Sequence, residues 1–366
     1  MPKELNKINF SYLPHLLKFK FEAGTSRGTL KEKRTFFIKA SSNLSPDIYG
    51  WGEAAPLPKL SPDDLPDFEV LLSNLCIDLS GKTIPKEDKA IFQWVKEHIP
   101  ENLPSVRFAF ETALLDFING GEKKIFQTDF ISFRKPIPIN GLIWMGNKDF
   151  MLKQIDQKLK EGYDCIKMKI GAIDFEQECS LLSYIRESYG ADRITLRVDA
   201  NGAFSPDEAM EKMTKLASFD LHSIEQPIKQ GQIKVMAKLC IQTPLPIALD
   251  EELIGIHGLE EKRDLLEKIK PQFIILKPTL LGGLDSSREW IELAESMEIG
   301  WWMTSALESN IGLNAIAQFT STFKTGLPQG LGTGQLYHNN VPSPLWIDSG
   351  TLCYDEEKQK WKNPEG

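Results

Sequence analysis

The sequence predicts an α/β fold for this 366-residue chain, with a TIM-type (β/α) barrel in its middle. From position 137 short β-rich runs alternate with amphipathic helical patterns over about 200 residues, as expected for parallel strands joined by helices. Charged residues recur every 25 to 30 positions at the ends of these runs. The N-terminal third lacks this period, so we expect a second, smaller domain there.

The N-terminal part has the pattern of antiparallel strands followed by helices. Polar and glycine-containing breaks separate three β-rich runs, and apolar residues at helical spacing follow them. Gly120 and Gly121 provide a stop for the second helix. The expected strands cover residues 17–22, 35–40 and 48–53, and the expected helices cover residues 68–80 and 106–119.

The barrel region contains eight expected strands, with clear helix starts between them. Ser205, Pro206 and Glu208 form one such start, because serine caps the helix, proline suits its first turn and glutamate completes a capping box. The active site of a barrel of this type lies at the C-terminal ends of its strands. The expected strands are residues 136–140, 165–170, 194–199, 222–225, 247–250, 273–277, 300–304 and 329–331.

The barrel period ends near Tyr337, and this sets the expected domain boundaries. We expect an N-terminal domain over residues 1–125, the barrel over residues 126–336, and a C-terminal segment over residues 337–366 that returns to the N-terminal domain. The sequence leaves the oligomeric state open.

Composition narrows the class of partner. The formal net charge is −8, whereas proteins that bind nucleic acid or anionic membranes need a basic surface. The five cysteines are scattered and contain no Cys-x-x-Cys pair, which predicts free thiols in a reducing compartment. We therefore expect a cytoplasmic protein with a small-molecule substrate, no nucleic-acid partner and no membrane partner.

Three acidic residues share the same position at the ends of successive strands: Asp199, Glu225 and Asp250. Each alone has a plain explanation as a turn or loop acid, but three at one strand position and one spacing favour a common site. Carboxylates without histidine or thiol suit a hard divalent cation, so we expect Mg2+, with Mn2+ as a possible substitute. Asn201, Gln226 and Glu251 are candidates for orienting these ligands.

Three lysines accompany the acids. Lys167 and Lys169 are two residues apart on one strand and so share a face, and Lys277 follows the apolar run 273–276. Burying a lysine without a partner is costly, so an inward-facing pair needs a reason. Lysines beside a metal ion can take a proton from carbon, and burial with a neighbouring cation lowers a lysine pKa enough for that role.

These residues resemble those of the enolase superfamily, in which a lysine or histidine base works with Mg2+ on an enediolate. Lys-x-Lys on the second strand, carboxylates on the third to fifth and a lysine on the sixth are similar to the muconate cycloisomerase subgroup. The resemblance covers nearly the whole chain. It implies a modified (β/α)7β barrel under an α+β capping domain built from both ends of the chain.

The resemblance also implies residue roles. Asp199, Glu225 and Asp250 correspond to the metal ligands, and Lys169 corresponds to the base. Lys277 corresponds to the lysine on the opposite face of the substrate. Lys167 corresponds to the lysine that helps to hold the substrate carboxylate.

The loops resemble one branch of this subgroup, the o-succinylbenzoate synthases of menaquinone-making bacteria. The similar stretches are residues 52–57, 304–312 and 330–334. Dipeptide epimerases of the subgroup carry an Asp-x-Asp motif after the last barrel strand, and this chain has no acidic residue between Glu308 and Asp348. The reaction implied by this resemblance is a syn dehydration of 2-succinyl-6-hydroxy-2,4-cyclohexadiene-1-carboxylate to 2-succinylbenzoate, so the resemblance implies a lyase.

Four residues are candidate contacts for the dicarboxylate substrate: Arg27, Ser305, Ser309 and Gly332. Arg27 lies in a glycine-flanked loop of the N-terminal domain, where a solvated turn arginine is an equally good interpretation.

Two alternative functions stay open. One is an N-acylamino acid racemase or dipeptide epimerase with both lysines as acid and base, and the other is a barrel that binds metal without turnover.

Overall fold

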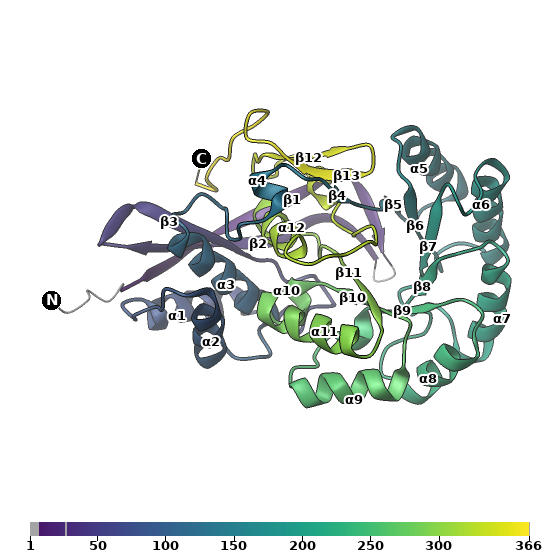
Figure 1. Ribbon diagram of the computed structural model, residues 1–366, viewed down its shortest axis with the longest axis horizontal. Helices are drawn as coiled ribbons and strands as arrows, with labels where there is room; N and C mark the ends of the chain where they lie inside the picture. The colour runs from purple at the N-terminus through teal and green to yellow at the C-terminus, as the bar shows by residue number, and fades with distance from the viewer. Residues whose placement is uncertain (1–6, 26–27, 366) are drawn as a thin grey trace.

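The computed structural model describes residues 7–25 and 28–365, which form a barrel flanked by an antiparallel sheet with helices (Figure 1). The sheet and its helices occupy the left of Figure 1, and the barrel strands with their outer helices occupy the right. This arrangement confirms the predicted fold class of a (β/α) barrel with an α+β capping part.

The N-terminal sheet has three antiparallel strands, longer than predicted: β1 (Asn9–Thr25), β2 (Gly28–Ser42) and β3 (Ser45–Ala54). Three helices pack beside it: α1 (Phe68–Leu79), α2 (Asp88–His98) and α3 (Pro104–Ile118). The contact between β3 and α3 is very close, because a Cβ at Gly52 would lie 1.9 Å from the backbone oxygen of Ala109. Helix α2 is absent from the prediction, and no side chain caps its N-terminus.

The barrel is a seven-stranded parallel sheet in the order β11-β10-β9-β8-β7-β6-β5. Residues 329–330 close it through parallel bridges, from Ile139 to Gln329 on one side and from Thr304 to Gly330 on the other. The strands are β5 (Gly141–Ile143), β6 (Cys165–Lys169), β7 (Thr195–Asp199), β8 (Ser223–Glu225), β9 (Ile247–Leu249), β10 (Phe273–Leu276) and β11 (Gly300–Met303).

The first predicted barrel strand differs from the structure. Residues Ile137–Pro138 form β4, which pairs with the C-terminal strand β13 (Thr351–Tyr354), and the residues that pair with β6 are those of β5. Proline lacks an N–H donor and is therefore suited to the outer strand that β4 forms. The C-terminal sheet is completed by β12 (Leu345–Asp348).

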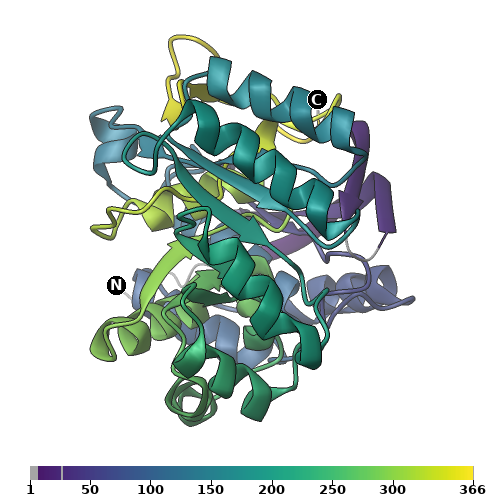
Figure 2. The same cartoon turned by 90° about the vertical axis from the view of Figure 1, so that its right-hand side faces the viewer.

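Helices cover the outside of the barrel strands (Figure 2). The Ser205 capping box is formed at the start of α7 as predicted. The helices after α3 are α4 (Asp129–Ser132), α5 (Lys148–Lys160), α6 (Phe175–Ser188), α7 (Pro206–Ala217), α8 (Ile233–Gln242), α9 (Leu259–Ile269), α10 (Pro278–Leu281), α11 (Leu284–Ser296) and α12 (Asn310–Thr320), with short 3-10 turns η1 (Glu251–Leu253) and η2 (Thr333–Gln335).

The C-terminal segment runs back along the first strand. The backbone N–H of His338 donates to the oxygen of Lys18 at 2.9 Å, and that of Lys20 donates to the oxygen of Leu336 at 2.8 Å. Residues 336–338 are therefore attached to β1 of the N-terminal sheet. Among the helices of the described residues, none has the length and apolar character that a membrane crossing requires.

Candidate active site

Neighbouring barrel strands bring the predicted charged residues to one mouth. Lys169 ends β6 and pairs in register with Asp199, which ends β7, and Asp199 pairs with Glu225, which ends β8. Asp250 and Lys277 directly follow β9 and β10. Parallel strands place their C-terminal ends on the same side, and this explains why residues far apart in sequence meet here.

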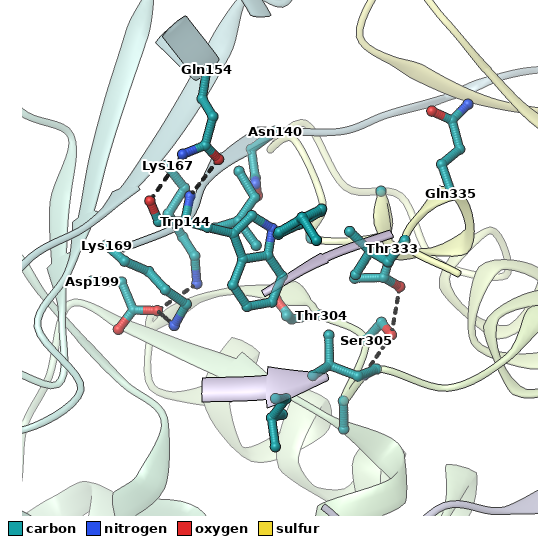
Figure 3. Close-up of a pocket in the computed structure, with 18 of the residues that line it drawn as sticks. Asn140, Trp144, Gln154, Lys167, Lys169, Asp199, Thr304, Ser305, Thr333 and Gln335 are labelled. Atoms are coloured by element: carbon teal, nitrogen blue, oxygen red, sulfur yellow. Dashed lines mark hydrogen bonds and ion pairs between the residues drawn. The ribbon is translucent and has the colours of Figure 1, made fainter. Parts of the chain in front are cut away.

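The lysines and carboxylates form two largely buried sets of ion pairs, one of Lys167 and Lys169 with Asp199 and Glu225, the other of Lys277 with Asp250. Figure 3 shows Lys167, Lys169 and Asp199 of the first set. The Lys167 ammonium lies 3.0 Å from an Asp199 oxygen and 2.7 Å from a Glu225 oxygen. Lys169 contacts the same Asp199 oxygen at 3.0 Å and the Asn201 side-chain oxygen at 2.7 Å. Lys277 donates to Asp250. All three acids are at most 2% exposed, so solvent does little to screen these charges.

Burial and mutual repulsion shape the ionisation of these groups. Burial, together with the nearby Asp199 and Asp250 charges, raises the pKa of Glu225 to about 8. Burial also acts to raise the pKa of Asp199, but Lys167 and Lys169 outweigh it and hold that pKa well below its usual range. Conversely, burial alone would lower the pKa of Lys167, and the carboxylates of Asp199 and Glu225 raise it instead. The lysines therefore compensate the charge of Glu225 less than that of Asp199.

The acids could hold a divalent cation once the lysines yield their contacts. In the described part of the chain, no group of three or more His, Cys, Asp or Glu side chains stands ready to hold a metal ion, and lysines contact each of the three carboxylates. However, Glu225 Oε1 is buried without a hydrogen-bond partner. A buried carboxylate oxygen without a partner, beside two further carboxylates, is a donor set that hard cations prefer. These residues fit a divalent ion.

Side-chain amides brace the loops that carry the acids. The side-chain oxygen of Gln226 accepts from the backbone N–H of Asp250 at 3.2 Å, and its amide donates to Glu252 at 3.1 Å. Asn201 donates to Glu251 at 3.0 Å. Asn201 and Gln226 both adopt left-handed backbone angles, with φ of 44° and 39°. The residues predicted to orient the acids therefore lie in the loops that carry Asp199, Glu225 and Asp250, and hydrogen bonds hold these loops in place.

A cavity of about 480 Å³ opens next to these ion pairs and reaches the N-terminal sheet (Figure 3). Lys167, Lys169, Asp199 and Lys277 line one end. Its other walls combine an apolar set with a polar set. The apolar residues include Phe21, Leu30, Leu57, Trp144, Leu307 and Leu336, and the polar residues include Asn140, Gln154, Thr304, Ser305, Thr333 and Gln335.

Of the four predicted substrate contacts, only two line the cavity among the described residues. Ser305 and Gly332 line the cavity, and the Ser305 hydroxyl accepts from Thr333 at 2.7 Å. Ser309 is not among the lining residues, since it caps α12 and its hydroxyl donates to Glu53 at 2.5 Å. Arg27 lies outside the described residues.

Several lining residues went unpredicted. Asn140 follows the bridged residue Ile139, Thr304 follows β11, and both have buried side-chain oxygens without a hydrogen-bond partner. Their position at strand ends, which identified the acids, was a usable signal for them as well. Trp144 and Gln154 are brought in by the packing of α5, and the sequence alone gives no such signal. Gln154 accepts from the backbone N–H of Trp144 at 2.9 Å.

Comparison with known proteins gives a consistent result. Residues 151–355 match the family described as enolase C-terminal domain-like. An o-succinylbenzoate synthase from Desulfotalea psychrophila is 46% identical, over 95% of this chain and 99% of that protein. The crystal structure of MenC from the same organism has a TM-score of 0.85 at 43% identity, covering 95% of this chain and 99% of that one. The L-Ala-D/L-Glu epimerase of Bacillus subtilis is 24% identical over 75% of this chain and 74% of its own length.

Proposed function

Because this chain belongs to the o-succinylbenzoate synthases of the enolase superfamily, we propose that it dehydrates 2-succinyl-6-hydroxy-2,4-cyclohexadiene-1-carboxylate to 2-succinylbenzoate in menaquinone biosynthesis. The observation that carries the proposal is the position of Lys169 and Lys277 in a cavity whose described lining contains two further lysines, Lys59 and Lys158, outside the acid cluster and no carboxylate other than Asp199. Residues 330–334 offer backbone donors and no negative charge. An anionic substrate without an ammonium group suits such a cavity.

Different residues of the site bind the metal ion and the substrate. We assign Asp199, Glu225 and Asp250 to a divalent cation, with Mg2+ as the proposed ion and Mn2+ as a substitute. When bound, this cation supplies positive charge that favours the deprotonated form of the substrate. Lys167 neutralises part of the acid cluster and faces the cavity, where it can contact the substrate carboxylate.

Lys169 carries out the proton transfers. Its amine removes the proton alpha to the ring carboxylate, and the electron pair shifts into the carboxylate as an enediolate. Lys277 lowers the energy of this charge by its ammonium. The C–O bond to the ring hydroxyl then breaks, and Lys169 returns its proton to the leaving hydroxide to form water. One group serves both steps because a syn elimination has both events on one face.

The dicarboxylate also fits the remaining cavity. Apolar side chains such as Leu57, Trp144 and Leu307 can cover the ring, and Ser305 and Thr333 add hydroxyl groups to the cavity lining. Ser305 and Gly332 remain our proposed substrate contacts, together with Arg27. Ser309 does not line the cavity and acts instead as a helix cap.

We also propose the domain division into residues 1–125, 126–336 and 337–366. The contacts of residues 336–338 with β1 support the return of the C-terminal segment. The five free cysteines support a reducing, cytoplasmic location for the enzyme and its small-molecule substrate.

Turnover of the proposed substrate tests the function. Purified protein should convert it with kcat/KM of at least about 10⁴ M⁻¹ s⁻¹ in Mg2+, an ordinary enzyme efficiency, and should lose turnover in EDTA. The change is followed by ultraviolet absorbance as the ring becomes aromatic. No turnover in Mg2+ would contradict the proposal.

The second candidate is an N-acylamino acid racemase. Curated relatives include an N-succinylamino acid racemase from Amycolatopsis that is 26% identical over 67% of this chain. Lys169 and Lys277 could then exchange a proton on opposite faces. Exchange of the alpha proton of N-succinylamino acids in D2O, measured by NMR, would reveal this activity whether or not the dehydration occurs.

A further inference from the structure

A lysine of the N-terminal sheet reaches across to the cavity wall. Lys33 lies on β2 and is only 1% exposed. Its ammonium donates to the backbone oxygen of Leu307 at 2.9 Å, 274 residues away in the sequence. The Tyr337 hydroxyl donates to the same oxygen at 2.7 Å. The Leu307 carbonyl of the barrel thus accepts hydrogen bonds from both the N-terminal sheet and the C-terminal segment.

The backbone at this carbonyl has an unusual conformation. Leu307 has a φ of 67°, in the left-handed region that residues with a Cβ seldom adopt. Such a conformation persists only where surrounding contacts hold it. The two hydrogen bonds to its oxygen supply that restraint.

The charge of Lys33 is matched by two buried carboxylates. Burial lowers the pKa of Lys33, and the fully buried Glu308 and Glu53 oppose this shift by favouring its charged form. Glu53 accepts backbone N–H groups of Ser309 and Gly312 at 2.8 and 2.9 Å, at the N-terminus of α12, where a negative charge is favourable. Lys33 therefore sits in a charge cluster that joins the N-terminal sheet to the barrel.

The same cluster reaches both sides of the active site. Glu308 accepts from the Ser305 hydroxyl at 2.5 Å and from the Thr279 hydroxyl at 2.5 Å. Ser305 lines the cavity, and Thr279 is two residues after Lys277. Residues 304–307, all of which line the cavity, are consequently held between α10, which begins directly after Lys277, and the N-terminal sheet.

We propose that Lys33 is a positioning residue, which fixes the Leu307 carbonyl and so sets the shape of the cavity wall that faces the substrate. The inference rests on the proposed function, because it assigns this wall to substrate binding. Lys33 does not line the cavity itself and acts only through Leu307. A displacement of this wall by about 1 Å would lower catalysis by up to about 100-fold.

Lys33→Met tests this, with Lys262→Met as a matched control. Lys262 is also fully buried, and it donates to Ser286 and Glu289 on the outside of the barrel, away from the cavity. Both variants lose a buried ammonium, so both should unfold at lower urea. At a temperature where both remain folded, Lys33→Met should lower kcat/KM about 10- to 100-fold, mainly through a higher KM. Lys262→Met should stay within about twofold of the wild type.

Tyr337→Phe gives a second and milder variant. It removes the other hydrogen bond to the Leu307 oxygen and should raise KM in the same direction. Because both groups act through one carbonyl, the double variant should change kcat/KM by clearly less or clearly more than the product of the single effects. If Lys33→Met does not fold, a wild-type KM in Tyr337→Phe is sufficient to overturn the proposal.

The outcomes separate this inference from the proposed function. Absence of turnover in the wild-type protein contradicts the function. An active wild type with equal kinetic effects of Lys33→Met and Lys262→Met, or with independent effects of Lys33→Met and Tyr337→Phe, contradicts the positioning role alone. Calorimetric titration with 2-succinylbenzoate should show the same order of affinities, with weaker binding in Lys33→Met and Tyr337→Phe only.

Discussion

Replacing Lys167 with methionine should destabilise the protein strongly without metal and less strongly with it. The Lys167 ammonium lies 3.0 Å from Asp199 and 2.7 Å from Glu225, and both carboxylates are buried. At an effective dielectric constant of about 20, the ion pair with Asp199 is on the order of 5–6 kcal/mol before desolvation is counted. The contact with Glu225 contributes less at pH 7, because the pKa of Glu225 is raised to about 8 and the carboxyl is largely protonated there. Burial of the ammonium offsets much of this attraction. Removing one partner of such a network typically costs about 3–5 kcal/mol, because the remaining charges stay buried.

A divalent ion among the same carboxylates would replace much of the lost positive charge. The cost of Lys167→Met should therefore be smaller in saturating Mg2+ than in EDTA, and linkage requires the variant to bind Mg2+ more tightly. Urea unfolding at pH 7 in both conditions measures the two costs. Lys262→Met serves as a control, with the same cost in both conditions. An equal or larger cost of Lys167→Met in Mg2+ would refute the placement of the metal beside Lys167.

Two further predictions concern stability. Burial raises the pKa of Glu111 to about 8, although the Leu284 N–H opposes the shift, so the folded state binds an extra proton between pH 4.5 and 8. The free energy of unfolding therefore falls as pH rises across that window. Glu111→Gln removes the titrating group, so the urea midpoint of this variant should fall less between pH 5 and 8 than that of the wild type. An unchanged slope of midpoint against pH would contradict the raised pKa of Glu111. Gly52→Ala should cost more than about 3 kcal/mol, because its Cβ would meet the Ala109 backbone at 1.9 Å, whereas Gly326→Ala, with open space around it, should be nearly neutral by thermal unfolding. A mild effect at Gly52 would contradict the close approach of β3 and α3.

The sequence was most informative where local pattern and barrel geometry coincide. Asp199 and Glu225 end their strands as predicted, since a parallel strand has a strong β-rich pattern and a defined C-terminal end. The spacing of the charged residues was therefore sufficient to predict that they meet at one mouth. The Ser205 capping box was readable for a similar reason, because all of its contacts lie within four residues.

The remainder depends on contacts between distant parts of the chain. The Ser309 hydroxyl donates a hydrogen bond to Glu53, 256 residues away, and no local sequence pattern predicts that contact. The pairing of β4 with β13 instead of β6 likewise depends on where the C-terminal segment returns. The pattern of β2 does not single out Lys33, since the role that we propose for it depends on its hydrogen bond to the distant Leu307 carbonyl.

The assignment of Lys169 as the base is the central claim, and one kinetic comparison tests it directly. Lys169→Ala removes contacts to Asp199 and Asn201, but Asp199 keeps its contact with Lys167, so we expect a modest stability cost of about 1.5–3 kcal/mol. In saturating Mg2+ the variant should retain metal binding and lose at least about 10³-fold in kcat on the cyclohexadiene substrate, the scale expected for loss of a general base. Turnover near the wild-type rate in a folded, metal-bound Lys169→Ala protein would contradict the mechanism.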